Sequence, residues 1–209
     1  MKIGVLGTGM VGHALASKLV ALGHHVMMGS RSADNVDATT WVKTAGPRAT
    51  AGTFADAAAF GEIVFNCTQG AHSLAALSAA GAANLDDTIV VDVANVISPE
   101  KSVSESLGEQ IQNTFPQAKV VKTLNTVNSA LMVNPGTLSQ SHTLFISGND
   151  AGAKMTVREL LKAFGWTDII DLGDIATARA TEGYLPLWLT MWKQLGTLNF
   201  NIKVVRAQP

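Results

Sequence analysis

The sequence predicts an α/β protein built on a doubly wound, mostly parallel sheet with a small helical extension at its carboxyl end. Short apolar runs alternate with helix-like segments through most of the 209 residues, the pattern of parallel strands joined by helices. These runs contain few polar residues, which indicates strands buried on both faces. A glycine-rich turn directly follows the first run, at the edge where sheets of this kind hold their ligands.

The expected elements follow one another without long linkers. Strands are expected at 1–6, 24–29, 49–50, 62–67, 88–93, 119–123, 142–147 and 168–172. Helices are expected at 11–22, 53–59, 71–80, 107–115, 151–164 and 176–195. Their spacing is that of strand–helix–strand units, which places the carboxyl ends of the parallel strands at one edge of the sheet.

The first turn carries a G-x-G-x-x-G pattern that joins a strand to a helix. Gly7 permits a tight turn, Gly9 leaves room for a phosphate, and Gly12 lets the helix pack closely. The free N–H groups and positive dipole of a helix N-terminus attract anions. We therefore predict that this turn binds the diphosphate of a dinucleotide, the alternative being a turn used only for packing. The predicted residues are Gly7, Thr8, Gly9, Met10, Val11 and Gly12.

The end of the second strand indicates which dinucleotide binds. An NAD-specific fold usually has an acidic residue there, about 20 residues past the glycines. This chain has Ser30, Arg31 and Ser32 instead. A guanidinium pairs with a 2′-phosphate, and two hydroxyls add donors. We therefore predict NADP(H), although Asp34 follows in the loop and Arg31 could alternatively be a solvated loop residue.

Composition excludes several classes of protein. The formal net charge is −1, so there is no basic surface for nucleic acid. The single Cys67 cannot form an intrachain disulfide and fits a reducing compartment. No apolar stretch reaches the roughly 20 residues that a membrane span needs. Since the first strand begins at Met1, we expect no signal peptide and a cytoplasmic protein.

The loop after the fourth strand is a further candidate for the cofactor site. Thr68 is expected to contact the diphosphate or a ribose, and Gln69 lies beside it. His72 either faces the cleft or simply lies near the start of the next helix. Cys67 is expected to be a buried strand residue and not a nucleophile, because the sequence places no base beside it.

The loops after the fifth and sixth strands are expected near the nicotinamide. Ala94 and Asn95 follow the fifth strand, and the Asn95 amide either orients the nicotinamide ring or ribose or stabilises a turn. The loop at 124–128 is expected to line the acceptor side. Lys122 and Asn125 are the only catalytic candidates, since their spacing is the Lys-x-x-Asn of hydroxyacid dehydrogenases. In those enzymes the pair lies on a helix, whereas here it ends a strand. No metal site is predicted.

The segment 176–195 is crowded with large apolar residues. Trp188 and Trp192 share one helical face, and Pro186 either kinks the helix or marks a new start. The favoured interpretation is core packing plus the interface of a homodimer. The other interpretation is an aromatic wall over a flat hydride acceptor. Residues 200–206 are expected to form a closing strand or an extended tail.

These features resemble the family of coenzyme F420-dependent NADP oxidoreductases, in its broad sense. The resemblance rests on the glycine turn, on residues 22–31 and 121–126, and on the small tail. That family is similar to the soluble reductase domains of eukaryotic ferric reductases, which also use NADPH. The resemblance implies NADPH binding through the glycine turn, Ser30 and Arg31. It also implies hydride exchange with a deazaflavin (coenzyme F420) or a flavin held by the carboxyl-terminal part.

We therefore expect an NADP-binding Rossmann domain at 1–148 and a small α/β extension at 149–209 that forms the acceptor site, the dimer interface, or both. The expected activity is hydride exchange between NADP(H) and a flavin or deazaflavin-type small molecule. The protein must hold nicotinamide C4 about 3–3.5 Å from the accepting atom, while the cofactor carries the chemistry. The alternatives are a reductase of a small carbonyl or imine, which needs a proton donor, and a non-catalytic NADP sensor.

Overall fold

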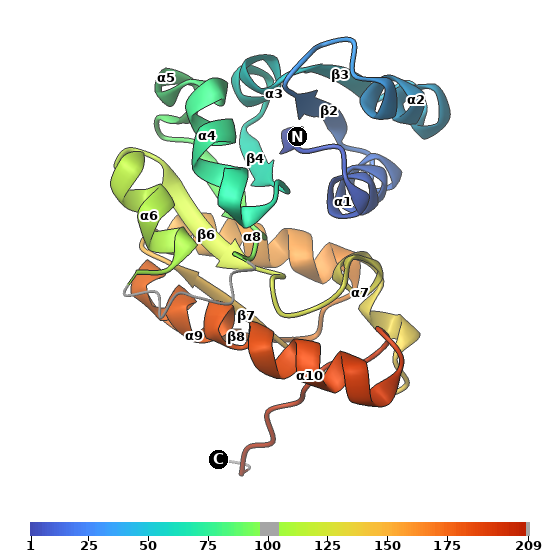
Figure 1. Ribbon diagram of the computed structural model, residues 1–209, viewed down its shortest axis with the longest axis vertical. Helices are drawn as coiled ribbons and strands as arrows, with labels where there is room; N and C mark the ends of the chain where they lie inside the picture. The colour runs from blue at the N-terminus through green and yellow to red at the C-terminus, as the bar shows by residue number, and fades with distance from the viewer. Residues whose placement is uncertain (97–104, 208–209) are drawn as a thin grey trace.

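The computed structural model describes residues 1–96 and 105–207. Its strands form one eight-stranded sheet in the order β3-β2-β1-β4-β5-β6-β7-β8 (Figure 1). The strands are β1 (Lys2–Leu6), β2 (His25–Ser30), β3 (Ala49–Thr53), β4 (Ile63–Asn66), β5 (Ile89–Asp92), β6 (Lys119–Thr123), β7 (Thr143–Gly148) and β8 (Asp168–Asp171). All neighbouring strands are parallel except β6 and β7. The predicted doubly wound, mostly parallel α/β fold is confirmed.

Helices cover both faces of this sheet (Figure 1). On one face lie α1 (Met10–Ala21), α2 (Val36–Ala45), α7 (Ser129–Val133) and α8 (Ala151–Phe164), and on the other lie α3 (Phe54–Phe60), α4 (Gly70–Ala80), α5 (Ala82–Leu85), α6 (Leu107–Thr114) and α9 (Ala178–Gly183). Ile3 and Val5 pack with the first layer, and Leu6 packs with the second. This alternation explains why the strands are apolar on both faces.

Side-chain caps fix where several helices begin. Thr53 caps α3 by accepting a hydrogen bond from the Asp56 N–H, and the Asp56 carboxylate accepts one from the Thr53 N–H. Ser106 and Glu109 form the same reciprocal pair at α6. Such capping boxes satisfy N–H groups that the helix itself leaves unpaired. The predicted cap at Thr53 is confirmed.

Besides the four-residue α5, two helices, α2 and α7, were not expected from the sequence. Helix α2 begins at its cap Asn35, which accepts a hydrogen bond from the Ala38 N–H. Trp41 anchors α2 in the core, where its indole N–H donates to the Ser17 hydroxyl of α1 at 3.0 Å. The polar first turns of α2 obscure its periodicity, and α7 has only five residues, so neither gives a clear apolar stripe.

The carboxyl-terminal part continues the sheet. Strand β8 pairs with β7, so hydrogen bonding crosses the predicted boundary at residue 148, and the domain division stays a prediction. The single helix expected at 176–195 is instead a 3₁₀ turn, η2 (Ile175–Thr177), followed by α9 and α10 (Leu185–Leu195). Pro186 lies in the first turn of α10, so it marks a new start.

The tail after α10 is extended and forms no strand within the described residues. It is held at β7, where the Thr143 N–H donates to the Ile202 carbonyl at 2.9 Å. The 3₁₀ turn η1 (Pro135–Thr137) follows α7. None of the helices in the described part of the chain is long and apolar enough to cross a membrane.

Helix α9 is fastened to α6 by a forked ion pair. The Arg179 guanidinium donates to both carboxylate oxygens of Glu109, at 2.6 and 2.5 Å. These hydrogen bonds, together with those from Ser106, lower the pKa of Glu109 to about 2 although its desolvation opposes the shift. The carboxylate therefore stays ionised through the physiological range, and α9 keeps its place on α6.

This pair predicts a dependence of stability on pH. A carboxyl whose pKa is lowered in the folded state contributes stability above its unfolded pKa and loses it as the pH falls through the folded pKa. We expect Arg179→Met to lower the free energy of unfolding at neutral pH, with the deficit shrinking from about pH 4.5 towards pH 2. Urea unfolding across this range measures it, with exposed Lys43→Met as the control. A deficit that is constant with pH would contradict the assignment.

Candidate dinucleotide site

A cavity of about 700 Å³ opens at the carboxyl ends of β1, β2 and β4. The structure brings together eight of the predicted cofactor residues in its lining: Gly7, Thr8, Gly9, Ser30, Arg31, Thr68, Gln69 and His72. The lining also contains six residues that the sequence did not assign to the cofactor site: Asn35, Phe54, Cys67, Ala75, Ala76 and Ala79. This is the edge at which a doubly wound sheet binds nucleotides.

The three glycines of the first turn have different roles. A Cβ on Gly12 would lie 2.1 Å from the Gly7 carbonyl oxygen, and one on Gly7, whose φ is 117°, would lie 2.9 Å from the Cys67 carbonyl oxygen. These two glycines are therefore required for the turn itself. A Cβ on Gly9 would meet nothing within 4 Å. Gly9 thus faces open space in the cavity, as expected of a backbone that a ligand approaches.

The start of α1 suits an anion. Gly9 is the residue before the first helical turn, and no side chain caps it. The N–H groups of the first turn, beginning at Met10, are therefore left for a ligand. Together with the positive end of the helix dipole, they make a site for a diphosphate. Met10 and Val11 contribute to this turn through their backbone, since their side chains do not line the cavity.

The loop after β2 presents one cation to the cavity. The Ser30 hydroxyl donates to the Ser32 carbonyl at 2.5 Å, and the Ser32 hydroxyl donates to the Asp34 carboxylate. That hydroxyl lowers the pKa of Asp34. Both serine hydroxyls are thus engaged within the loop, while Arg31 lines the cavity and forms no ion pair with another described residue. The guanidinium is the group best placed to pair with a 2′-phosphate.

An apolar wall lies beside Arg31. It consists of the ring of Phe54 at the start of α3 and three alanines on α4: Ala75, Ala76 and Ala79. An aromatic ring with small neighbours leaves a slot for a flat heterocycle such as adenine. In the sequence, the alanines of α4 have the spacing of residues that simply pack a helix. The wall becomes apparent only where α3 approaches α4 in space.

The loops after β5 and β6 are joined by two amides. Asn95 Nδ2 donates to the Asn125 carbonyl at 2.6 Å, and Asn125 Nδ2 donates to Asn95 Oδ1 at 3.1 Å. Leu124, which directly precedes Asn125, has a φ of 62°, a conformation that costs a residue with a side chain about 1–3 kcal/mol. None of these residues lines the 700 Å³ cavity, nor do Ala94, Gly12 or Ser32. Their contact with the cofactor stays a prediction.

Lys122 is fully buried in an ionic cluster. Its ammonium lies 2.7 Å from Asp92 Oδ2, 2.9 Å from Glu182 Oε1 and 2.6 Å from the Ala94 carbonyl. Burial by itself would lower the pKa of Lys122, but the two carboxylates outweigh burial and raise it. All three N–H bonds are used inside the protein. A role for Lys122 as a catalytic acid, one of the two candidates from the sequence, is therefore not supported.

Cys67 lies just after β4, is partly buried and lines the cavity, so its expected position as a buried strand residue is wrong. Desolvation, with a smaller contribution from the Asp92 carboxylate, raises the pKa of the Cys67 thiol. The thiol therefore stays protonated at neutral pH, as expected for a cysteine that is not a nucleophile.

The aromatic residues of α10 and of the segment after it lie beside the loop that follows β6. Trp188 has its ring centroid 5.5 Å from that of Phe200 and 5.9 Å from that of Trp192. Asn128, which caps α7, donates to the Leu198 carbonyl. No residue of α10 is buried within one copy of the chain, so the expected contribution of this helix to the core is wrong. The homodimer and the acceptor wall stay predictions.

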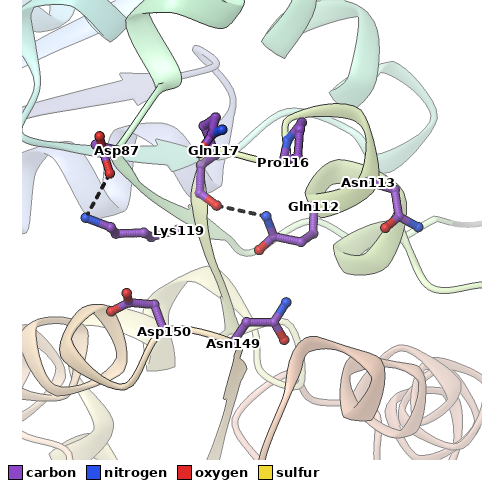
Figure 2. Close-up of a pocket in the computed structure, with 9 residues that line it drawn as sticks. Asp87, Gln112, Asn113, Pro116, Gln117, Lys119, Asn149 and Asp150 are labelled. Atoms are coloured by element: carbon purple, nitrogen blue, oxygen red, sulfur yellow. Dashed lines mark hydrogen bonds and ion pairs between the residues drawn. The ribbon is translucent and has the colours of Figure 1, made fainter.

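A second pocket, of about 500 Å³, lies at the opposite edge of the sheet, where β6 begins and β7 ends (Figure 2). Lys119 pairs with Asp87 at 3.4 Å, Gln112 donates to the Ala118 carbonyl at 2.8 Å, and Asp150 caps α8. These lining groups are engaged by other groups of the protein, and none of the predicted site residues lies here. The cavity at the carboxyl ends of the strands is therefore the candidate site.

The chain is similar to known NADP oxidoreductases and reductases. The sequence model of the family described as NADP oxidoreductase, coenzyme F420-dependent, matches residues 2–96. A crystal structure from Arthrobacter sp. FB24, named as a candidate F420-dependent NADP reductase, is 50% identical with a TM-score of 0.92, covering 99% of this chain and 100% of that one. Metalloreductase STEAP3 of Rattus norvegicus is 32% identical over 92% of this chain, which spans only 38% of that relative.

More distant structures share the fold alone. An imine reductase from Aspergillus terreus, solved with NADPH4 and dibenz[c,e]azepine, is 18% identical with a TM-score of 0.68. The alignment covers 93% of this chain and 62% of that chain. This likeness confirms the arrangement of strands and helices and says nothing about the substrate.

The glycine turn predicts unequal effects of two substitutions on stability. We expect Gly12→Ala to lower the free energy of unfolding by about 1–3 kcal/mol, because its Cβ meets the Gly7 carbonyl. Gly9→Ser should change it by less than about 1 kcal/mol, since the space is open and serine caps helices well. Urea unfolding of both variants measures the difference. Equal losses would mean that Gly9 is also a packing residue.

Proposed function

The chain belongs to the family of coenzyme F420-dependent NADP oxidoreductases and is an NADP-dependent oxidoreductase; from this premise we propose that it exchanges a hydride between NADP(H) and a flavin or deazaflavin-type acceptor. The observation that carries the choice of acceptor is the engagement of Lys122, whose three N–H bonds are all used inside the protein. Lys122, the only cation predicted near the nicotinamide, thus presents no free N–H group to an acceptor.

The cavity accounts for the binding of NADP(H). The uncapped start of α1 and the space at Gly9 fit the diphosphate. Arg31 fits the 2′-phosphate, and the wall at Phe54 fits the adenine. These groups bind the adenosine half firmly and orient the rest of the cofactor, whose nicotinamide C4 supplies the hydride.

The surroundings of the predicted nicotinamide position favour an acceptor that needs no acid. Asn95, Asn125 and Thr126 are neutral amides and a hydroxyl at the ends of β5 and β6. Reduction of a carbonyl or imine requires a proton donor of suitable pKa, which neutral amides and a threonine hydroxyl do not supply. A flavin or deazaflavin ring delocalises the added charge itself. The names of the Arthrobacter protein and of the family agree with such an acceptor.

A turnover screen tests the acceptor. We expect coenzyme F420, FAD, FMN or riboflavin to oxidise NADPH. The loss of NADPH absorbance measures this reaction. With NADPH deuterated at C4 and a deazaflavin as acceptor, mass spectrometry should find one deuterium on the reduced ring, because C5 of a deazaflavin keeps the hydride.

Controls in the same screen distinguish the other functions. A ferric chelate without a flavin should give no turnover. Turnover only with carbonyls or imines would overturn the proposal in favour of a small-molecule reductase. Tight NADPH binding without any turnover would overturn it in favour of a sensor.

Arg31 should determine the preference for NADP over NAD. We expect Arg31→Ala to weaken NADPH binding by about 1.5–3 kcal/mol, the value of a charge-assisted hydrogen bond, and to leave NADH nearly unchanged. Isothermal titration calorimetry with both dinucleotides measures this. Equal losses for the two cofactors would refute the role of Arg31.

Two further variants sharpen this measurement. Arg48→Ala removes an exposed cation outside the cavity and should leave both affinities unchanged. Asp34→Asn removes a negative charge from the loop that carries Arg31, so NADPH, with its extra phosphate, should bind several-fold more tightly while NADH changes little.

A further inference from the structure

A chain of hydrogen bonds, mostly buried, runs from the ionic cluster to the cavity. Lys122 donates to Asp92 Oδ2 at 2.7 Å. Asn66 Nδ2 donates to Asp92 Oδ1 at 2.8 Å, and the Thr68 hydroxyl lies 2.6 Å from Asn66 Oδ1. Lys122, Asp92 and Asn66 are buried, whereas Thr68 lines the cavity. We call these four residues the buried chain.

Elementary chemistry fixes the direction of every bond in the buried chain. The Asp92 carboxylate beside the ammonium of Lys122 can only accept hydrogen bonds. The atom of Asn66 that faces it must therefore be the donor, Nδ2. The opposite atom, Oδ1, is then an acceptor, and it faces Thr68.

The proton of the Thr68 hydroxyl is consequently used inside the protein, because it is donated to Asn66 Oδ1. The backbone N–H of Thr68 points to the same oxygen, at 3.4 Å. The Ser73 hydroxyl lies 3.0 Å from Thr68 Oγ1 and also reaches the Gln69 carbonyl. Thr68 therefore offers lone pairs to the cavity and no donor. A phosphate, which offers only acceptors, cannot be its partner.

The strand order places Thr68 on the nicotinamide side. Arg31 follows β2, the glycine turn follows β1, and Thr68 follows β4. Since β1 lies between β2 and β4, a dinucleotide with its 2′-phosphate at Arg31 and its diphosphate at the turn extends its other half past Thr68. The donors on that half nearest the diphosphate are the ribose hydroxyls.

We propose that Thr68 Oγ1 accepts a hydrogen bond from a hydroxyl of the nicotinamide ribose, and that the buried chain makes it an acceptor. This inference rests on the proposed binding of NADP(H). It settles the choice that the sequence left open for Thr68 in favour of a ribose over the diphosphate. Thr68 thereby positions the nicotinamide without contacting the 2′-phosphate or the adenine.

Two variants and three ligands test this role by isothermal titration calorimetry. Thr68→Val keeps the shape and removes the hydroxyl, while Thr68→Ser keeps the hydroxyl as the matched control. The ligands are NADPH, adenosine 2′,5′-bisphosphate, which lacks the nicotinamide ribose, and an NADPH analogue without the two hydroxyls of that ribose.

We expect Thr68→Val to weaken NADPH binding about three- to tenfold and to leave adenosine 2′,5′-bisphosphate unchanged. Thr68→Ser should stay within about twofold of wild type for every ligand. The analogue should bind wild type about as weakly as NADPH binds Thr68→Val, with no further loss when the two changes are combined.

The other outcomes separate a failure of the role of Thr68 from a failure of the proposed function. If wild type binds both NADPH and the bisphosphate but Thr68→Val binds NADPH equally well, the role of Thr68 is wrong and the proposed function stands. Equal weakening of both ligands would mean that Thr68 acts through packing or the diphosphate, which also overturns the inference. If wild type binds neither ligand, the proposed function itself is wrong.

Discussion

One buried ammonium group connects the two parts of this structure. Lys122 has no exposed surface and would be costly to bury without partners. Its charge is balanced by the carboxylates of Asp92 in β5 and Glu182 in α9. Glu182 also accepts hydrogen bonds from the backbone N–H groups of Leu107 and Gly108, at the start of α6. The position of the carboxyl-terminal part therefore depends on a charge that lies inside the nucleotide-binding sheet.

The same cluster sets the polarity of the site. Asp92 faces Lys122 with one oxygen and Asn66 with the other. As a result, the Thr68 hydroxyl that follows β4 has hydrogen-bond acceptors and no donor left for a ligand. The uncapped start of α1 and the guanidinium of Arg31 form an edge of donors. A dinucleotide carries acceptors on its phosphates and donors on its riboses, and a cavity divided in this way matches both along its length.

Much of this arrangement could be predicted from local sequence patterns. The turn at Gly7, Gly9 and Gly12 and the capping threonine Thr53 are short-range signals, and each is where the sequence placed it. The new helix at Pro186 is one of two alternatives that the sequence left open. Helix α2 was missed because its first turns are polar. The wall at Phe54 was missed because it forms only when α3 and α4 meet at the cavity.

The sequence by itself determined the sheet, its carboxyl edge and the glycine turn, because apolar periodicity and glycine geometry act within a few residues of chain. Only the tertiary structure decided which groups Lys122 and Thr68 contact. The partners of Lys122 come from positions 92, 94 and 182, and the direction of the Thr68 hydroxyl depends on Asn66 and, through it, on Asp92. Whether a polar side chain is free to act on a ligand depends on which donors and acceptors surround it in space, and distant segments of the chain supply these.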